Sequence, residues 1–516
     1  MQDISAALLT AIAHQQAARH AEAEALYREV LAGAPFEPQA NYLYGLLQLG
    51  TGQTADAARN LARAVAGRPG HIGARLSLGR ALLAERCNTE ALAAGDAVLE
   101  RDPDNAQALF LRGTALGALG RHAEAVATLR RAVAVDPANE AAHLHLGNAL
   151  ADLDQLAAAE AACRDAIARD PALVEAWVSL SFVLTSRGRL AEAIAACEAA
   201  LARQPDCAQA HWNLAVAALL AGDYTRGFAE YEWRKRHDRY RRDFIDSPGP
   251  VWSGDDPAGR TILVHAEQGF GDTIQFARYL PLIAARGARV VLVCDARLTP
   301  WLGTIQGVTA ALPFEAELPR YDAWIDQMSL PRVFATRPGT IPHAGGYLRP
   351  DPARVAAWSR QLPAGRKVGV AWAGNPLHSN DRRRSLPADA VAALLATPGI
   401  RFVNLQTGPR AGETGLADLS SCLADYAATA ALVANLDLVV TVDTSVAHVA
   451  GALGVPCWVM LPFAPDWRWG LERDDTGWYA ALRLFRQAEP GRWDAVIARI
   501  CAALQAWRGA CLADGA

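Results

Sequence analysis

The sequence predicts an α-solenoid followed by an α/β region with two similar halves. The solenoid is predicted by a 34-residue repeat, and the α/β region by β-rich runs that alternate with helical patterns after Arg260. Hydrophobic residues make up 52% of the 516 residues and charged residues 20%, so the chain has enough apolar surface to fold. At about 100 to 200 residues per domain, this length corresponds to about three domains.

Three rows of residues define the repeat. Prolines recur every 34 residues, at 35, 69, 103, 137, 171 and 205. Alanines keep the same interval at 23, 57, 91, 125, 159 and 193, and small residues form a third row at Gly45, Gly79, Gly113, Gly147, Ser181 and Ala215. Proline ends one helix and small residues allow two helices to pack closely. We therefore expect helix pairs that start near 4, 38, 72, 106, 140 and 174.

This pattern resembles the tetratricopeptide (TPR) repeat. A seventh unit from residue 208 loses the register at Gly227 and Arg239, as a terminal cap often does. The resemblance implies a superhelix whose concave face holds a peptide or protein partner, with a purely structural solenoid as the alternative. Asp152 and Asp154 resemble a metal-binding Asp-x-Asp pair, but their place in the repeat predicts a solvated turn.

A basic segment marks the end of the array. Six Arg or Lys residues lie between 234 and 242, and a stretch rich in Pro, Gly and Asp follows. The cluster could hold an anionic partner, but a solvated helix end or a salt-bridged surface between domains is favoured. We expect four parts: repeats at 1–241, a linker at 242–260, a first α/β half at 261–365 and a second at 366–516.

The two α/β halves are predicted from alternating strand and helix patterns. Expected strands lie at 261–266, 290–294, 367–373, 401–406, 437–442, 456–461 and 482–486. Expected helices lie at 272–286, 387–396, 427–435 and 445–453, and a terminal helix is expected to pack across both halves. Two doubly wound sheets in tandem place the carboxyl ends of their strands around a shared cleft, where such folds bind ligands.

The first candidate loop follows the first expected strand and opens a helix. Its candidate residues are Glu267, Gln268, Gly269, Gly271 and Asp272. Glycines let the backbone approach a ligand, and a helix N-terminus favours a bound phosphate or a carboxylate. A simple capping role for Asp272 is the alternative.

The second candidate loop also leads from a strand into a helix. It contains Asp443, Thr444, Ser445 and His448. Hydroxyls and free N–H groups at a helix start form an anion site, and His448 lies in the first turn beside it. Capping alone would explain Thr444 and Ser445, but it would not explain Asp443 and His448.

Further candidates lie beyond strand ends of the second half. Arg382 and Arg384 belong to a run of three arginines that could neutralise a diphosphate, with a solvated charge run as the alternative. Asn375 is a further cleft candidate. Trp467 could stack on a nucleotide base, although core packing is at least as well supported.

Together, these loops resemble those of GT-B glycosyltransferases, which have two Rossmann-like halves, and most closely the heptosyltransferase-like group. The resemblance covers about 260–490. It implies that Asp272 is the general base, that Asp443, Thr444, Ser445 and His448 bind the donor diphosphate, and that Arg384 steadies the leaving group. Ser445 stands where that family usually has Gly, and Arg384 where Lys is usual.

The combination of repeats and transferase is also similar to protein O-GlcNAc transferases and to bacterial TPR transferases that glycosylate flagellin. The asparagine ladder of the O-GlcNAc enzymes is missing, since the corresponding positions are Leu43, Ser77, Leu111, His145, Ser179 and Asn213. The resemblance implies transfer of a sugar from a nucleotide donor to a hydroxyl of a protein acceptor. A cell-surface saccharide acceptor and a non-catalytic TPR scaffold remain open.

Composition limits the classes of partner and cofactor that the protein is expected to bind. A net charge of −4 lacks the positive field of a nucleic-acid binder. Nine scattered cysteines without a CxxC pair favour reduced thiols over disulfides or a zinc site. No long apolar segment predicts a membrane span, so we expect a soluble, cytoplasmic protein that uses a nucleotide sugar as substrate and needs no metal or other cofactor.

Overall fold

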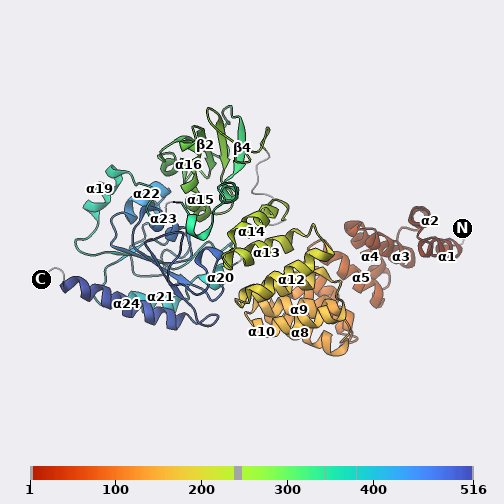
Figure 1. Ribbon diagram of the computed structural model, residues 1–516. Coiled ribbons are helices and arrows are strands. Elements are labelled where there is room, and N and C mark those ends of the chain that lie inside the picture. Colours follow the sequence, from red (N-terminus) through yellow and green to blue (C-terminus); the bar gives the residue numbers. More distant parts are fainter. Residues whose placement is uncertain (1–3, 238–246, 343–344, 379, 514–516) are drawn as a thin grey trace. The chain divides into compact units, whose positions relative to one another are not determined.

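The computed structural model of the protein describes residues 4–237, 247–342, 345–378 and 380–513 (Figure 1). The chain forms two compact units, 1–183 and 184–516. The boundary between them falls inside the repeat array. The last repeats therefore belong to the same unit as both sheets, whereas the sequence suggested a limit at 241.

The first unit is a row of helix pairs, and its repeat starts are confirmed. Its helices are α1 (Ile4–Gln16), α2 (His20–Gly33), α3 (Pro38–Gly50), α4 (Thr54–Gly67), α5 (Ile72–Ala84), α6 (Asn88–Leu99), α7 (Ala106–Ala118), α8 (His122–Val135), α9 (Glu140–Asp152) and α10 (Leu156–Arg169), and α11 (Val174–Ser186) crosses the boundary. Their starts match the predicted 34-residue spacing.

Close helix packing explains the row of small residues. A Cβ atom at Gly45 would lie 2.6 Å from Cγ of Leu61, and one at Gly113 would lie 2.5 Å from Cγ of Leu129. Both distances are shorter than van der Waals contact, so a larger residue would push the helices apart. The predicted turn at Asp152–Asp154 is confirmed, because α9 ends at Asp152 and Asp154 has a positive φ of 58°.

The second unit begins with the remaining repeat helices. These are α12 (Leu190–Arg203), α13 (Ala208–Leu220), α14 (Tyr224–Glu230) and the 3₁₀ helix η1 (Tyr231–Arg236). Of these, α13, α14 and η1 share one apolar core with the sheets: Phe228 packs edge-on against Trp467, with ring centroids 5.7 Å apart, and the Trp478 indole N–H donates to the Tyr224 hydroxyl at 3.1 Å. The end of the array is thus an integral part of the α/β unit.

The first sheet has four parallel strands in the order β3-β2-β1-β4. They are β1 (Thr261–His265), β2 (Arg289–Cys294), β3 (Val308–Pro313) and β4 (Ala323–Asp326). The associated helices are α15 (Phe270–Phe276), η2 (Ala277–Tyr279), α16 (Leu280–Ala285), α17 (Thr299–Leu302), η3 (Gln327–Ser329), α18 (Leu330–Val333) and η4 (Pro338–Thr340). The two predicted strands of this half are confirmed, and β3 and β4 were missed.

The second sheet has five parallel strands in the order β6-β5-β7-β8-β9. They are β5 (Val368–Ala371), β6 (Phe402–Asn404), β7 (Leu438–Val442), β8 (Cys457–Leu461) and β9 (Leu482–Arg486), and all five were predicted. The helices are α19 (Pro352–Gln361), α20 (Asp381–Arg384), α21 (Ala388–Leu395), η5 (Ser420–Cys422), α22 (Tyr426–Val433), α23 (Ser445–Leu453), η6 (Trp467–Trp469) and α24 (Trp493–Ala513).

The terminal helix differs from expectation. Buried residues of α24, including Ile500 and Leu504, pack in one core with Val370 and Leu438 of the second sheet. Among the α24 residues whose side chains are described, the buried ones pack in the core of the second half, whereas the sequence suggested packing across both halves.

Each sheet has a point where the strand order reverses, so that the next strand is added on the other side of the first one. In the first sheet β1 lies between β2 and β4, and in the second β5 lies between β6 and β7. In parallel α/β sheets the crevice at the carboxyl ends of such neighbouring strands is the usual ligand site. The ends of the strand pairs β1/β4 and β5/β7 are therefore the expected ligand sites.

Two residues of the basic segment that follows the repeats pair with carboxylates at or just beyond the carboxyl ends of β1 and β4. Nη2 of the fully buried Arg234 donates to Oε1 of Glu267 at 2.6 Å, and its Nε donates to Oε2 at 2.9 Å. Nζ of Lys235 lies 2.6 Å from Oδ2 of Asp326. The salt-bridge interpretation therefore holds for these two residues, while 238–242 lie outside the described residues.

Candidate functional site

The β5/β7 crevice carries the second candidate loop. Asp443 follows β7, and Thr444 is the N-cap residue of α23. The Thr444 side chain does not cap the helix, because its hydroxyl lies 3.2 Å from the Thr441 hydroxyl. The Ser445 hydroxyl accepts a hydrogen bond from the Tyr426 hydroxyl at 2.8 Å. The first-turn N–H groups of this nine-residue helix are thus not capped by Thr444, and they carry the positive end of its dipole.

Arg384 joins the other side of the crevice to this loop. Its Nη1 donates to the Asp443 carbonyl at 3.1 Å, and its Nε donates to Asp381 at 3.2 Å. A Cβ atom at Gly374, after β5, would lie 2.7 Å from Cζ of Arg384. The guanidinium of Arg384 therefore occupies the space that a side chain at this position would take.

Arg382 and Asn375 lie on the surface of the same loop region. Both side chains are exposed, and Oδ1 of Asn375 accepts the Leu377 N–H at 3.0 Å within a local turn. Of the arginine run, Arg384 is the member that the structure places against the Asp443 loop.

The Asp443 carboxyl has an altered acidity. Burial and the neighbouring Asp466 carboxylate raise its pKa to about 6, although Arg384 acts in the opposite direction. This carboxyl is therefore more easily protonated than an exposed aspartate.

The first candidate loop lies at the end of β1. Asp272 accepts the Gly269 N–H at 2.9 Å, which is a capping contact at the start of α15. Gln268 adopts a φ of +64°, a conformation that costs a non-glycine residue energy. Capping is thus one role of Asp272, and the loop before it is locally strained.

The structure brings the two candidate loops together at Gly271. A Cβ atom there would lie 2.6 Å from Cδ2 of His448 and 3.0 Å from Nε2. Glycine is needed because the imidazole of α23 occupies that space. Asp272 of the first half therefore directly follows Gly271, the residue that contacts His448 of the second half.

His448 is held as a neutral imidazole. Its Nδ1 lies 2.7 Å from the Tyr479 hydroxyl, and burial together with Arg468 and Arg278 lowers its pKa well below the usual value. A neutral ring can exchange hydrogen bonds with a ligand without adding charge.

Asp272 also forms an ion pair that the sequence did not suggest. Nη2 of Arg468, in η6, donates to Oδ1 of Asp272. Burial raises the pKa of Asp272, whereas Arg468 lowers it. The Asp272 side chain is 19% exposed, so it can be reached from solvent.

Three other candidates make contacts within the protein. Both carboxylate oxygens of Glu267 are occupied by Arg234, and Oε1 also accepts the Met328 N–H at 3.1 Å. Oε1 of Gln268 accepts from the Tyr231 hydroxyl at 3.2 Å. Trp467 is buried among the aromatic rings of Tyr224, Phe228 and Trp478. Trp467 therefore belongs to the core, and the carboxylate of Glu267 is taken up by Arg234 and the Met328 N–H.

Sequence reasoning missed Gln275 and Asp466. Both accept hydrogen bonds from Arg468, which lies about 190 residues from Gln275 in sequence. Within the described part of the chain, Nε2 of Gln275 and Nε1 of Trp467 are buried without a hydrogen-bond partner. Unpaired buried donors are uncommon, and they gather here around Arg468.

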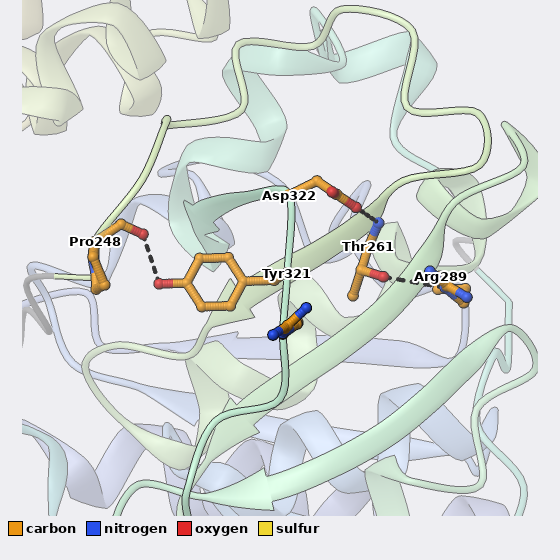
Figure 2. Close-up of a pocket in the computed structure, with 6 residues that line it drawn as sticks. Pro248, Thr261, Arg289, Tyr321 and Asp322 are labelled. Carbon is orange, nitrogen blue, oxygen red and sulfur yellow. Dashed lines mark hydrogen bonds between the residues drawn. The ribbon is translucent and has the colours of Figure 1, made fainter.

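A cavity of about 430 Å³ lies elsewhere, at the amino ends of β1 and β2 (Figure 2). It is lined by Pro248, Thr261, Arg289, Arg320, Tyr321 and Asp322. Figure 2 shows Tyr321 bonded to Pro248, and Thr261 bonded to both Asp322 and Arg289. Its polar groups are thus largely paired with one another, and it is not at the carboxyl ends where the candidate loops meet.

The described residues show neither a metal-ligand cluster nor a membrane-spanning helix. They contain no group of three His, Cys, Asp or Glu side chains arranged to hold a metal ion. Among the same residues, no helix combines the length and apolarity that crossing a bilayer requires. The cysteines at 87, 163, 197, 207, 294, 422, 457 and 501 are free thiols.

Comparison with known proteins identifies the repeats. A tetratricopeptide repeat family model matches residues 8–72, 45–106, 110–173 and 184–232. The first 230 or so residues are therefore a TPR array, as predicted. Repeats of this type provide surfaces that bind protein partners.

Protein FlbA of Caulobacter vibrioides is similar to the chain. The two are 31% identical over 327 residues, which is 56% of this chain and 54% of FlbA. The chain thus spans about half the length of this curated relative.

Solved TPR structures are similar to part of the chain. A thermophilic TPR protein of Thermus thermophilus is 26% identical, with a TM-score of 0.32, covering 35% of this chain and 99% of that one. A tetratricopeptide repeat protein of Parabacteroides merdae is 14% identical, with a TM-score of 0.40. The match covers 46% of this chain and 94% of that one.

Proposed function

We propose that the chain is a metal-independent glycosyltransferase of the GT-B type. In this proposal it moves a sugar from a nucleotide-activated donor to a hydroxyl of a protein acceptor. Asp272 acts as the base, and the acceptor is recruited by the concave face of the TPR array. A saccharide acceptor is the alternative substrate within the same reaction type.

The observation that carries the proposal is the contact between Gly271 and His448. It joins the strand-end loop of one parallel sheet to the strand-end loop of another. Ligands of parallel α/β sheets bind outside the carboxyl ends of the strands. In a reaction with two substrates, one substrate would therefore bind at the loop of each sheet, and the two would meet where the loops are in contact. The acceptor then approaches Asp272, and the donor approaches α23.

The donor side has the groups that a diphosphate requires. The α23 N-terminus presents N–H groups, and Arg384 supplies a fixed guanidinium that is 14% exposed. Charge that accumulates on the leaving diphosphate is stabilised by such preorganised donors. Asp443, with its raised pKa, can meet the anion in its protonated form.

The proposed step is one inverting displacement. The acceptor oxygen forms a bond to the anomeric carbon while the bond from that carbon to the phosphate oxygen breaks. The electron pair of the broken bond leaves with the nucleoside diphosphate, and the acceptor proton passes to the Asp272 carboxylate. An uncharged alcohol is a weak nucleophile, so a carboxylate within reach of its proton contributes a factor of about 10² to 10⁴.

The TPR array supports a protein acceptor. Its family match extends to residue 232, and α13, α14 and η1 share a core with the first sheet. A protein bound by the last repeats is therefore held by the same compact unit that carries Asp272.

The test uses the full chain with a panel of nucleotide sugars and a cell extract. We expect mass shifts of one sugar on specific extract proteins, with release of the matching nucleotide. Nucleotide release with only saccharide modified would favour the alternative acceptor. No turnover with any donor would contradict the proposal.

A non-catalytic TPR scaffold is the second candidate function. It is favoured by the Arg468 ion pair and the capping contact, which give Asp272 a structural role. A scaffold predicts that partners bind to the repeats while every nucleotide sugar remains intact, so the same incubation separates the two functions.

A further inference from the structure

Arg468 is fixed from several sides around Asp272. Its Nη2 donates to Asp272, its Nε donates to Gln275, and its Nη1 donates to Asp466 at 2.8 Å. The guanidinium lies over the Trp467 ring, 4.6 Å from its centroid, and the side chain is 8% exposed. The guanidinium is thus held by three hydrogen-bond partners and one aromatic ring.

The pair connects the two halves of the α/β region. Asp272 belongs to α15, which follows the first strand of the first sheet, whereas Arg468 lies in η6, beyond β8 of the second sheet. The carboxylate is thus oriented by its own half through the Gly269 N–H and by the other half through Arg468.

The charges around Asp272 have opposing effects. From the segment after β8, Arg468 favours the ionised carboxylate and Asp466 disfavours it, and burial disfavours it further. From α23, His448 lies against the neighbouring Gly271, and its lowered pKa keeps it neutral near pH 7. Arg468 is therefore the cation that counteracts burial at this carboxyl.

We propose that Arg468 is the positioning residue of the base, which keeps the Asp272 carboxylate ionised and aimed between the two sheets. This proposal rests on the proposed function, in which Asp272 accepts the acceptor proton. Arg468 takes no part in bond making, because each of its three side-chain nitrogens donates to a protein group: Asp272, Gln275 or Asp466.

The first test measures how the Asp272–Arg468 ion pair affects stability, and it does not depend on sugar-transfer activity. The unfolding midpoint of the full chain is followed from pH 4 to 8 in the wild type, Arg468→Gln, Asp272→Asn and the double variant. A buried carboxyl with a raised pKa loses stability as pH rises from its unfolded pKa, about 4, to its folded pKa. Removing the cation raises the folded pKa further, so Arg468→Gln should lose more stability over this range.

The double variant identifies the source of this loss. We expect Asp272→Asn to cancel the extra pH dependence of Arg468→Gln, because no carboxyl is left to titrate. The same extra pH dependence in Arg468→Gln and in the double variant would overturn the proposal. Arg473→Gln is the matched control, since Arg473 is exposed and pairs with Asp475.

The second test measures the pH profile of sugar transfer with the donor that the nucleotide-sugar panel identifies. In Arg468→Gln, the acid limb of kcat/KM should move to higher pH by about one unit or more, with recovery at alkaline pH. Arg468→Lys retains the charge and should keep the limb near its wild-type position, and Arg473→Gln should leave it unchanged.

The outcomes distinguish the two proposals. An Arg468→Gln variant that loses activity by the same factor at every pH, with the limb unmoved, would give Arg468 a merely structural role and overturn the inference. Full activity in Asp272→Asn would instead contradict the proposed function, while the unfolding cycle would still report on the ion pair.

Discussion

Gly271 is the residue on which the meeting of the two loops depends. We expect Gly271→Ala to lower the free energy of unfolding by about 1–3 kcal/mol and to reduce transfer, because its Cβ would lie 2.6 Å from the His448 ring. Gly412→Ala is the control, since no atom lies within 4 Å of its added Cβ. Chemical denaturation of the three proteins measures the effect, and equal stability of both variants would contradict the contact.

The raised pKa of Asp443 predicts that stability depends on pH. Its pKa of about 6 exceeds the unfolded value of about 4, so stability should fall as pH rises between these values, by up to about 3 kcal/mol. Asp443→Asn should remove this part of the dependence. Unfolding midpoints between pH 4 and 8 test it, with exposed Asp389→Asn as the control. Parallel curves for wild type and Asp443→Asn would refute the shifted pKa.

Individual site residues were predictable to different degrees. The contact of His448 with Gly271 involves motif residues that the sequence already singled out. Arg468 could not be assigned from sequence, because its partner Asp272 is 196 positions away and the neighbouring Trp467 suggested stacking instead. Glu267 was placed in the cleft by its loop, but a buried cation from η1 takes both of its oxygens.

At the scale of elements, the ion pair between η1 and the end of β1 holds the repeats to the first sheet. We expect Glu267→Gln to cost about 3–5 kcal/mol, because it leaves the Arg234 charge buried without its partner. Glu124→Gln, in an exposed pair with Arg121, should cost less than about 1 kcal/mol. Thermal unfolding compares the two. Equal small effects would mean that the buried pair is not important for stability.

The elements themselves were largely predictable. The 34-residue rows predicted each repeat start, and strongly apolar runs predicted β1, β2 and all strands of the second sheet. Strand β3 was missed because its six residues are all partly or fully exposed and lack a buried-strand pattern. Strand β4 was missed because it has only four residues. The packing side of α24 depends on tertiary contacts that periodicity does not contain.

At the scale of the whole molecule, the compact units predict where the chain can be shortened. A chain that begins at residue 184 retains α13, α14 and η1, and we expect it to unfold cooperatively. A chain that begins at 242 lacks Tyr224, Phe228 and Arg234, so it exposes Trp467 and Trp478 and leaves Glu267 unpaired. We expect it to aggregate. Calorimetry and size-exclusion chromatography compare them, and a well-folded 242–516 chain would contradict this division.

The central claim is that Asp272 removes the acceptor proton. The most direct measurement compares Asp272→Ala with the wild type for sugar transfer and for affinity toward the donor's nucleoside diphosphate. The account predicts that transfer falls at least about 100-fold while nucleotide affinity changes by less than about threefold, because the diphosphate is held by α23 and Arg384. Affinity lost as completely as transfer would contradict the claim, since Asp272 would then be a binding or folding residue.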